Sequence, residues 1–308
     1  IKADGLALGK GVILAQNEDE AVAAVHEMID ELKFGKSSAR IVVEEFLTGP
    51  EVSVLSFTDG KTVVPMISSM DHKRALDGDE GLNTGGMGTV APNPYYTDDV
   101  AKLCMETIFK PTIEAMNAEG RTFEGCLYFG LMLTKDGPKV VEYNCRFGDP
   151  ETQVVLPMLD ADLCEIFEAI YDHKLADVDI KWKSGSCTCV VMASGGYPLS
   201  YPKGLEISGL NEMGQVDGAF VYHAGTKLAD GKFLTNGGRV LGVTCTALTL
   251  AEALKKSYAA VEKISWENVH YRHDIGQRAL KADVDPLDLD YKDDMEDYIE
   301  SNGVYLRQ

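Results

Sequence analysis

The 308-residue chain is poor in basic residues and has no long apolar run. Lys and Arg number 29 against 49 Asp and Glu, so the formal net charge is −20. A chain this acidic repels a phosphate backbone at long range, which argues against DNA or RNA as a partner. No apolar run approaches the roughly 18–20 residues of a membrane span, so we expect no membrane partner either. Any anionic ligand must be held locally, by backbone amides, a few cations or a metal ion.

Cysteine is scattered and never forms a CxxC pair. The seven cysteines stand at positions 104, 126, 145, 164, 187, 189 and 245. This odd number argues against a disulfide framework or a structural zinc site and favours a reducing compartment, the cytoplasm. The sequence shows no initiator Met, signal peptide or basic leader. Its first residues are typical of a strand that enters a loop, so we expect a chain truncated at its front.

Residues 1 to about 180 alternate strand-like and helix-like stretches. The pattern predicts helices at 21–32 and at 98–119, the second kinked or broken near Pro111, and strands at 41–43, 52–57, 61–67, 127–134 and 139–143. Asp-Gly pairs at 59–60 and 136–137 predict hairpin turns. Strand pairs followed by helices favour an antiparallel-rich α+β fold over a doubly wound sheet.

Short strands dominate from about residue 182 onward. We predict strands at 186–194, 219–227 and 240–247, followed by a helix at 250–264, with glycine- and proline-rich turns between them. The predicted domains are 1–181, then a smaller α+β domain at 182–282, then an acidic tail or linker at 283–308. That tail holds nine acidic residues against two basic ones.

A loop rich in glycine and lysine spans residues 2–12. Three glycines and two lysines there bring backbone N–H and ammonium groups within reach of a phosphate. The spacing is not that of a Walker A motif, and no Ser or Thr follows Lys10. A glycine-rich turn with surface lysines remains the alternative.

Two further segments combine acidic, basic and glycine residues. At 44–51, adjacent acids could accept hydrogen bonds from an adenine amino group or ribose hydroxyls, while Phe46 and Leu47 wall the base; a solvated strand end is the alternative. At 71–88, the titratable run 71–74 precedes a loop with little side-chain bulk, where bare backbone lets a ligand approach. A mobile surface loop would explain the glycines but not the nearby charges.

The most informative segment is 142–153. Glu142 and Asn144 stand two apart on a predicted strand, so their oxygens point to one face, and such oxygens suit a hard cation such as Mg²⁺. Arg146, two residues further on, is expected on the same side, placed to hold a carboxylate or a phosphoryl group. A charged strand end is the alternative.

In this order and spacing, the motifs resemble the ATP-grasp superfamily, and within it the phosphoribosylamine–glycine ligase family. The resemblance covers about residues 1–280 and rests on 2–12, 44–51, 71–88 and 125–153, with 223–226, 235–240 and 271–280 resembling that family's C-terminal domain. It implies a partial ATP-grasp domain followed by a C-terminal domain, and nothing here corresponds to the family's N-terminal domain.

The resemblance implies ATP-dependent ligation of glycine to 5-phosphoribosylamine in purine biosynthesis, through a glycyl phosphate. Carried over to this sequence, the resemblance implies that the ATP phosphates contact Lys2, Gly9, Lys10 and Gly11, that Glu44, Phe46 and Leu47 frame the adenine, and that Glu51 contacts the ribose. It implies Mg²⁺ or Mn²⁺ ligands at Glu142 and Asn144. It also implies an acceptor site at Asp71, Lys73 and Arg146 with the loop 85–88. Phosphoryl transfer needs positioning and charge neutralisation more than a protein nucleophile, so the lack of a recognisable catalytic triad fits.

Two other functions stay open from the sequence. Another ATP-grasp enzyme, whether a carboxylate–amine ligase or a carboxylating enzyme, would share the nucleotide clamp and take a different substrate. A truncated chain could instead bind nucleotide or a partner without ligating anything.

Overall fold

The computed structural model describes residues 1–5, 7 and 11–282, so the predicted acidic tail at 283–308 lies outside the described residues. The chain divides into a first unit that ends at Thr48 and a second that begins at Gly49. In the first unit, the elements are β1 (Lys2–Ala3), α1 (Glu18–Ile29), the 3₁₀ turn η1 (Gly35–Ser38) and β2 (Ile41–Val42), and β1 pairs antiparallel with β2.

Helix α1 begins and ends three residues earlier than predicted. The side chain of Asn17 accepts a hydrogen bond from the Glu20 N–H (3.0 Å) and caps the helix start. The helix ends before Leu32, whose φ is +51°. Of the apolar face predicted by spacing, Met28 is fully buried, whereas Val22 is 51% exposed. The spacing predicted the helix but did not predict which of its faces is buried.

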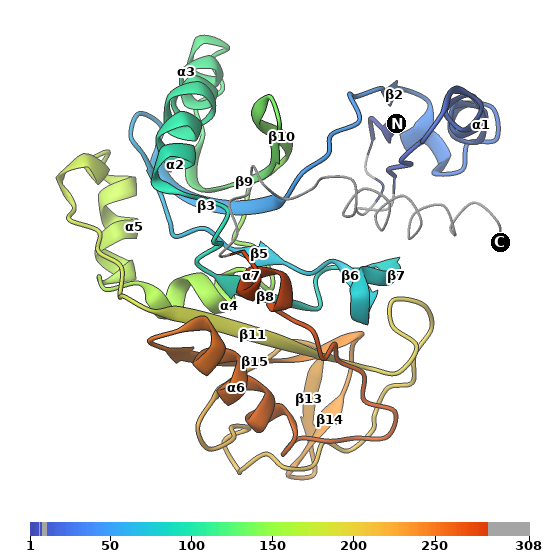
Figure 1. Ribbon diagram of the computed structural model, residues 1–308, viewed down its shortest axis with the longest axis vertical. Helices are drawn as coiled ribbons and strands as arrows, with labels where there is room; N and C mark the ends of the chain where they lie inside the picture. The colour runs from blue at the N-terminus through green and yellow to red at the C-terminus, as the bar shows by residue number, and fades with distance from the viewer. Residues whose placement is uncertain (6, 8–10, 283–308) are drawn as a thin grey trace. The chain divides into compact units, whose positions relative to one another are not determined.

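Two antiparallel sheets form the frame of the second unit (Figure 1). The four-stranded sheet has the order β10-β9-β3-β4, with β3 at Glu51–Asp59, β4 at Val63–Pro65, β9 at Glu124–Thr134 and β10 at Gly137–Asn144. The five-stranded sheet has the order β12-β15-β11-β8-β5, with β5 at Met70–Asp71, β8 at Gly88–Ala91, β11 at Ser186–Ala193, β12 at Phe220–His223 and β15 at Arg239–Ala247. Two small hairpins are β6 (Arg74–Leu76) with β7 (Glu80–Asn83), and β13 (Thr226–Ala229) with β14 (Lys232–Thr235).

The helices of this unit lie above, between and below the two sheets (Figure 1). They are α2 (Asp98–Cys104), the π-helical turn η3 (Met105–Phe109), α3 (Lys110–Ala118), α4 (Thr152–Val155), α5 (Leu163–Tyr171), α6 (Leu250–Val261) and α7 (Gln277–Leu280), with 3₁₀ turns η2 (Asp77–Asp79), η4 (Leu156–Met158) and η5 (Leu175–Asp177). None of the helices in the described ranges combines the length and the apolar character needed to cross a bilayer.

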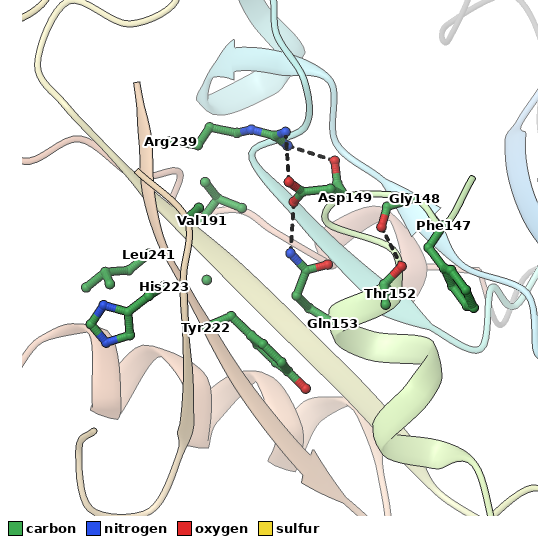
Figure 2. A pocket seen from close by; sticks show the side chains of 12 residues that line it. Phe147, Gly148, Asp149, Thr152, Gln153, Val191, Tyr222, His223, Arg239 and Leu241 are labelled. Carbon is green, nitrogen blue, oxygen red and sulfur yellow. Dashed lines mark hydrogen bonds and ion pairs between the residues drawn. The ribbon is translucent and has the colours of Figure 1, made fainter. Parts of the chain in front are cut away.

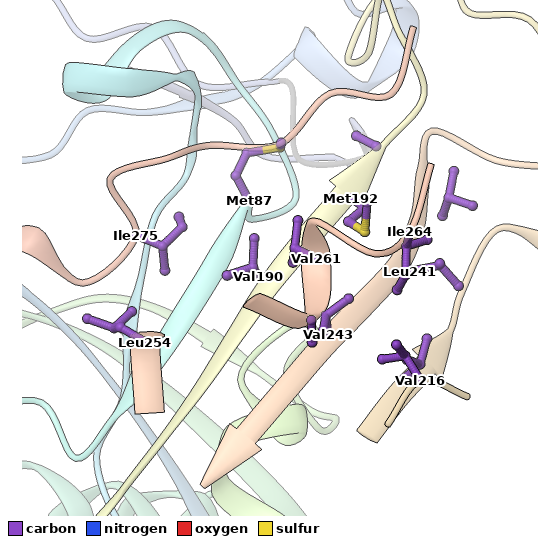
Figure 3. Close-up of a cluster of buried hydrophobic side chains, with 14 of the residues drawn as sticks. Met87, Val190, Met192, Val216, Leu241, Val243, Leu254, Val261, Ile264 and Ile275 are labelled. Carbon is purple, nitrogen blue, oxygen red and sulfur yellow. The ribbon is translucent and has the colours of Figure 1, made fainter. Parts of the chain in front are cut away.

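Three apolar clusters hold these layers together. One packs η3 and α3 on the four-stranded sheet, through Ile108, Phe109 and Ile113. A second fills the space between the sheets, where α4 and α5 meet β3 and β11. The third lies under the five-stranded sheet, where Val190 and Val243 pack with Leu254 and Val261 of α6 (Figure 3). Alternate residues of β11 serve different clusters, since Cys187 and Cys189 face α4 whereas Val190 and Met192 face the third cluster.

The antiparallel α+β fold class and the two Asp-Gly hairpins are confirmed. Three details differ from the sequence prediction. The helix near Pro111 is not broken: a π turn precedes it, because proline has no N–H to donate to the carbonyl one turn back. The strand predicted at 219–227 is two strands, β12 and β13, which pair with different partners on either side of Ala224-Gly225. The helix predicted at 250–264 ends at Val261.

The five-stranded sheet takes β5 and β8 from before position 181 and β11, β12 and β15 from after it. Strand β8 pairs with β11 across about 100 residues of sequence, with Val90 opposite Thr188. The two predicted zones therefore share one sheet, and the domain boundaries at 181 and 282 remain a prediction.

Candidate functional site

In the first unit, two of the predicted nucleotide-binding residues contact each other. Lys2 Nζ lies 2.6 Å from Glu44 Oε2. The segment 43–48 that follows β2 has no regular structure, and Phe46 in it is 40% exposed, while Leu47 is half-buried. An exposed ring beside a carboxylate is a surface on which a planar base can stack. Gly11 is buried and its carbonyl accepts the Ala3 N–H (2.8 Å), and Gly9 and Lys10 lie outside the described residues.

In the second unit, Glu142 and Asn144 lie together at the end of β10. The Asn144 Nδ2 donates to Glu142 Oε1 at 3.2 Å, so the two side chains share one face as predicted. The register shifts between Val140 and Glu142, which places the pair after a β-bulge. Both residues reach solvent, and carboxylate and amide oxygens suit Mg²⁺. Because the described ranges contain no group of three or more His, Cys, Asp and Glu fit to hold a metal, this pair would need oxygens from water or a phosphate.

Arg146 lies beyond the strand, because β10 ends at Asn144. Side-chain alternation along a strand, which predicted that Arg146 shares a face with Glu142, therefore does not apply to Arg146. Its exposed guanidinium donates to the Phe147 carbonyl (2.9 Å). The Phe147 ring packs edge-on against Phe57 (centroids 6.3 Å apart) and fixes the chain directly after Arg146. The arginine is thus held on a short loop, where its positive charge offsets part of the burial that raises the pKa of the neighbouring Glu151.

Lys73 and Glu51 form an ion pair, Nζ to Oε2 at 2.8 Å. The pKa of Glu51 lies below its usual value, mainly because of the charge of Lys73, and the pKa of Lys73 is raised, mainly by Glu51. Glu51 is the first residue of β3, and the resemblance implies that it contacts the ribose. In the structure it is already paired with Lys73, which the resemblance assigns to the acceptor site. The pairing also neutralises much of the charge that Lys73 would bring to an anionic ligand.

Asp71 and Glu151 are two carboxyl groups close enough to oppose each other's ionisation. Burial, and then the negative charge of Glu151, raises the pKa of Asp71 well above its usual range. Burial also raises the pKa of Glu151, whose Oε1 accepts the Tyr128 hydroxyl at 3.2 Å. Tyr128 in turn shares a 2.7 Å hydrogen bond with Ser53 on the neighbouring strand. Two neighbouring carboxyls with raised pKa values can hold a cationic group, which stabilises their charged forms.

The glycines at 85–88 are needed by the protein's own packing. Gly86 has φ of +112°, and a Cβ there would lie 2.6 Å from Asp71 Oδ1 and 2.4 Å from Pro150 Cδ. A Cβ on Gly88 would lie 2.7 Å from Ile275 Cδ1. Gly86, Met87 and Gly88 are buried and only Gly85 is exposed, so the low bulk that suggested ligand access lets strands and loops approach one another instead.

His72 separates the predicted acceptor-site residues Asp71 and Lys73 and is 4% exposed. Its Nε2 accepts the Gly276 N–H (3.1 Å), which leaves Nδ1 to donate to the Gly88 carbonyl (3.1 Å). Burial, and then the charge of Arg272, lowers the pKa of His72 to about 4. The imidazole is therefore neutral at pH 7 and adds no positive charge to the run 71–74.

We expect His72 to make folding sensitive to acid. The unfolded chain takes up its proton below about pH 6.5, but the folded chain only near pH 4, so the free energy of unfolding falls as the pH falls through that window. The loss is about 3 kcal/mol at pH 4 relative to pH 7. Urea denaturation of the wild type and His72→Gln at pH 7, 5.5 and 4.5 measures it, because glutamine does not titrate. Parallel pH curves for the two proteins would contradict the assignment.

A cavity of about 380 Å³ lies beside the loop that carries Glu151, between α4 and strands β11, β12 and β15 (Figure 2). Its lining includes Asp149, Gln153, Tyr222 and Arg239. Gln153 Nε2 donates to Asp149 Oδ1 (2.8 Å). Glu151 and Arg239 lie within the sequence motifs 142–153 and 235–240, but no role was predicted for either, and Tyr128 was not predicted as a site residue. The sequence feature that could have indicated Glu151 as a site residue is its position next to a proline in an otherwise polar loop.

The edge strand of an antiparallel sheet ends in a carboxylate–amide pair, and a second sheet lies behind it. This arrangement is that of an ATP-grasp protein. The family described as phosphoribosylglycinamide synthetase, ATP-grasp (A) domain, matches residues 1–152, and the corresponding C domain matches residues 187–278. The chain belongs to the phosphoribosylglycinamide synthetase family, also called phosphoribosylamine–glycine ligase.

Individual relatives agree with this assignment. The phosphoribosylamine–glycine ligase of Escherichia coli is 50% identical over 285 residues, which are 92% of this chain and 66% of that protein. The trifunctional purine biosynthetic protein adenosine-3 of Gallus gallus is 50% identical over 95% of this chain and 29% of its own length. The crystal structure of the Thermotoga maritima ligase superposes with a TM-score of 0.75 at 35% identity, covering 89% of this chain and 67% of that one. The chain thus spans about two thirds of the single-function ligases that it matches, and less than a third of the trifunctional protein.

Proposed function

We propose that this protein joins glycine to 5-phosphoribosylamine in de novo purine biosynthesis, using ATP and releasing ADP and phosphate. The observation that carries the proposal is the Glu142–Asn144 pair at the end of β10, followed at once by Arg146. A cation-binding pair next to an arginine suits the transfer of a phosphoryl group to a carboxylate. The ATP-grasp fold and the ligase relatives support the choice of substrates.

The remaining roles follow from the family. We assign the ATP phosphates to Lys2 and the loop 9–11, the adenine to Glu44, Phe46 and Leu47, the ribose to Glu51, Mg²⁺ or Mn²⁺ to Glu142 and Asn144, and the acceptor site to Asp71, Lys73 and Arg146. Mg²⁺ or Mn²⁺ bound at the pair would supply neutralisation of phosphate charge.

The domain boundaries at 181 and 282 and a cytoplasmic location belong to the same proposal, and the seven free thiols fit a reducing compartment.

The reaction has two steps. A glycine carboxylate oxygen attacks the γ-phosphorus of ATP, the bond to the β-phosphate oxygen breaks, and ADP leaves. The amine of phosphoribosylamine then attacks the acyl carbon, phosphate leaves with the bonding electrons, and the new amide nitrogen loses a proton. Arg146 is suited to orient the carboxylate and to balance charge during transfer.

Asp71 and Glu151 would serve the amino groups in these steps. Burial, and then the charge of Glu151, raises the pKa of Asp71, and burial raises the pKa of Glu151. A cationic group beside the two carboxyls would stabilise their charged forms, and the ammonium group of glycine is such a cation. We place the glycine ammonium near this pair and its carboxylate near Arg146.

ADP release with different substrates tests the function. We expect the expressed protein with ATP and Mg²⁺ to release ADP with glycine plus phosphoribosylamine and not with bicarbonate plus aminoimidazole ribonucleotide. ADP release with the second pair alone would show a different ATP-grasp enzyme. Titration calorimetry with ATP plus Mg²⁺ separates a non-catalytic protein, since binding without ADP release under any condition would overturn the ligase proposal.

A further inference from the structure

Arg239 is the first residue of β15, and its side chain reaches two loops that come from distant parts of the sequence. Its Nη1 donates to the carbonyl oxygens of Gly85 (2.6 Å) and Asp149 (2.8 Å), and Nη2 donates to Asp149 Oδ2 (3.3 Å). A further Nη1 contact reaches the Gly86 carbonyl at 3.3 Å. One guanidinium therefore connects residues that are 90 and 154 positions away in the chain.

The two loops carry the acceptor-site groups. Gly86 lies against Asp71, as the 2.6 Å separation between its hypothetical Cβ and Asp71 Oδ1 indicates. Asp149 stands three residues after Arg146 and two before Glu151. The same hypothetical Cβ lies 2.4 Å from Pro150, so the loops touch each other directly beneath the guanidinium. A shift of either loop would change the separation between Asp71 and the 146–151 segment.

The geometry around Arg239 uses the shape of the guanidinium and not only its charge. Its planar fork donates to carbonyls of both loops and to a carboxylate at once, which the single ammonium of lysine cannot reproduce. Asp149 is itself oriented, because its other oxygen accepts from Gln153 of α4 (2.8 Å) (Figure 2). The Arg239 side chain is 21% exposed, so solvent competes only in part with these bonds.

We propose that Arg239 is a positioning residue for the acceptor site: it bridges the 85–86 and 149–151 loops and so fixes where Asp71 and Glu151 lie relative to Arg146. The kinetic part of this inference rests on the proposed ligase function. The bridge itself does not, and it can be measured without any substrate.

The kinetic test compares Arg239→Ala and Arg239→Lys with Arg121→Ala, an exposed arginine just after α3 that serves as the matched control. We expect Arg239→Ala to lower kcat about 100-fold with the KM for ATP within twofold, because a misplaced group costs rate more than it costs nucleotide binding. Arg239→Lys recovers only part of the rate, and millimolar guanidinium restores part of the activity of Arg239→Ala. Arg121→Ala keeps wild-type kinetics.

Hydrogen–deuterium exchange tests the bridge directly. In Arg239→Ala, we expect amides at 84–88 and 146–151 to exchange at least tenfold faster, with α6 unchanged. A kcat of Arg239→Ala within twofold of wild type, or faster exchange spread evenly over the five-stranded sheet, would overturn the proposal in favour of a purely structural role. If the wild type shows no glycine-dependent ADP release, the ligase function fails, and the exchange experiment still decides whether the bridge exists.

Discussion

Replacing Arg272 by methionine should lower the free energy of unfolding by about 3–5 kcal/mol, because it removes the buried guanidinium that pairs with both Asp274 and Asp79. Arg272 is only 1% exposed. Its Nε and Nη2 donate to the two oxygens of Asp274 (both 2.8 Å), and its Nη1 donates to Asp79 (2.7 Å). These bonds connect the residues just before α7 to the η2 turn.

The pKa of Asp274 shows how strongly its carboxylate depends on Arg272. Burial would by itself raise the pKa of Asp274, but the hydrogen bonds from Arg272 and from the Gly78 N–H, together with the charge of Arg272, outweigh it and hold the value at about 2. Without the guanidinium, the carboxylate must either stay charged with the Gly78 N–H as a remaining donor or take up a proton. Both outcomes cost stability in the folded state.

Urea denaturation at pH 7 measures the effect, with Arg278→Met as its control. Arg278 also contacts Asp79 (3.3 Å), but its side chain is 52% exposed. An exposed ion pair contributes about 1 kcal/mol or less, so Arg278→Met should change stability little. Equal losses in the two variants would show that burial of Arg272 is not what makes it important.

Asn144→Ala should lower the rate of glycine-dependent ADP release about 100-fold at limiting Mg²⁺, which corresponds to about 2.7 kcal/mol in the barrier. The substitution removes one of the two side chains that offer oxygens to a cation at the end of β10. Because weaker metal binding causes the loss, raising the Mg²⁺ concentration should restore part of the rate. Full activity of the variant at limiting Mg²⁺ would exclude this role.

The strand offers a matched control for that experiment. Tyr143 lies between Glu142 and Asn144 in the sequence, and its hydroxyl shares a 3.1 Å hydrogen bond with Thr112 of α3. Tyr143→Phe therefore alters the same strand on its other face. We expect its rate and its Mg²⁺ dependence to stay within twofold of wild type.

Local sequence rules predicted what depends on a few neighbouring residues. The Asp136-Gly137 turn and the apolar runs beside it gave the β9–β10 hairpin, and alternation placed Glu142 and Asn144 on one face. The same rule did not reach Arg146, because where a strand ends depends on its partner strand. The bulge at Val141 is likewise set by pairing with β9, and no residue type marks it.

Long-range packing explains what sequence reasoning could not predict. The glycines at 85–88 suggested open backbone, yet their neighbours are Arg239, Pro150 and Ile275, which are 64 to 187 residues away in the sequence. His72 resembled one of three cations, and its burial and the charge of Arg272, which the sequence does not reveal, make it neutral. Both features arise when β8 inserts beside β11, and the distance between these strands in the sequence hides that pairing.

The insertion of β8 beside β11 also limits how the polypeptide can be cut. A fragment that starts at position 182 would carry β11 without β8, and the N–H and C=O groups of residues 187–190 that face it would lose their partners. A long apolar strand with one bare side is a template for self-association. Excision of the C-terminal half for separate expression should therefore give aggregates, unless residues 70–91 are grafted back onto it.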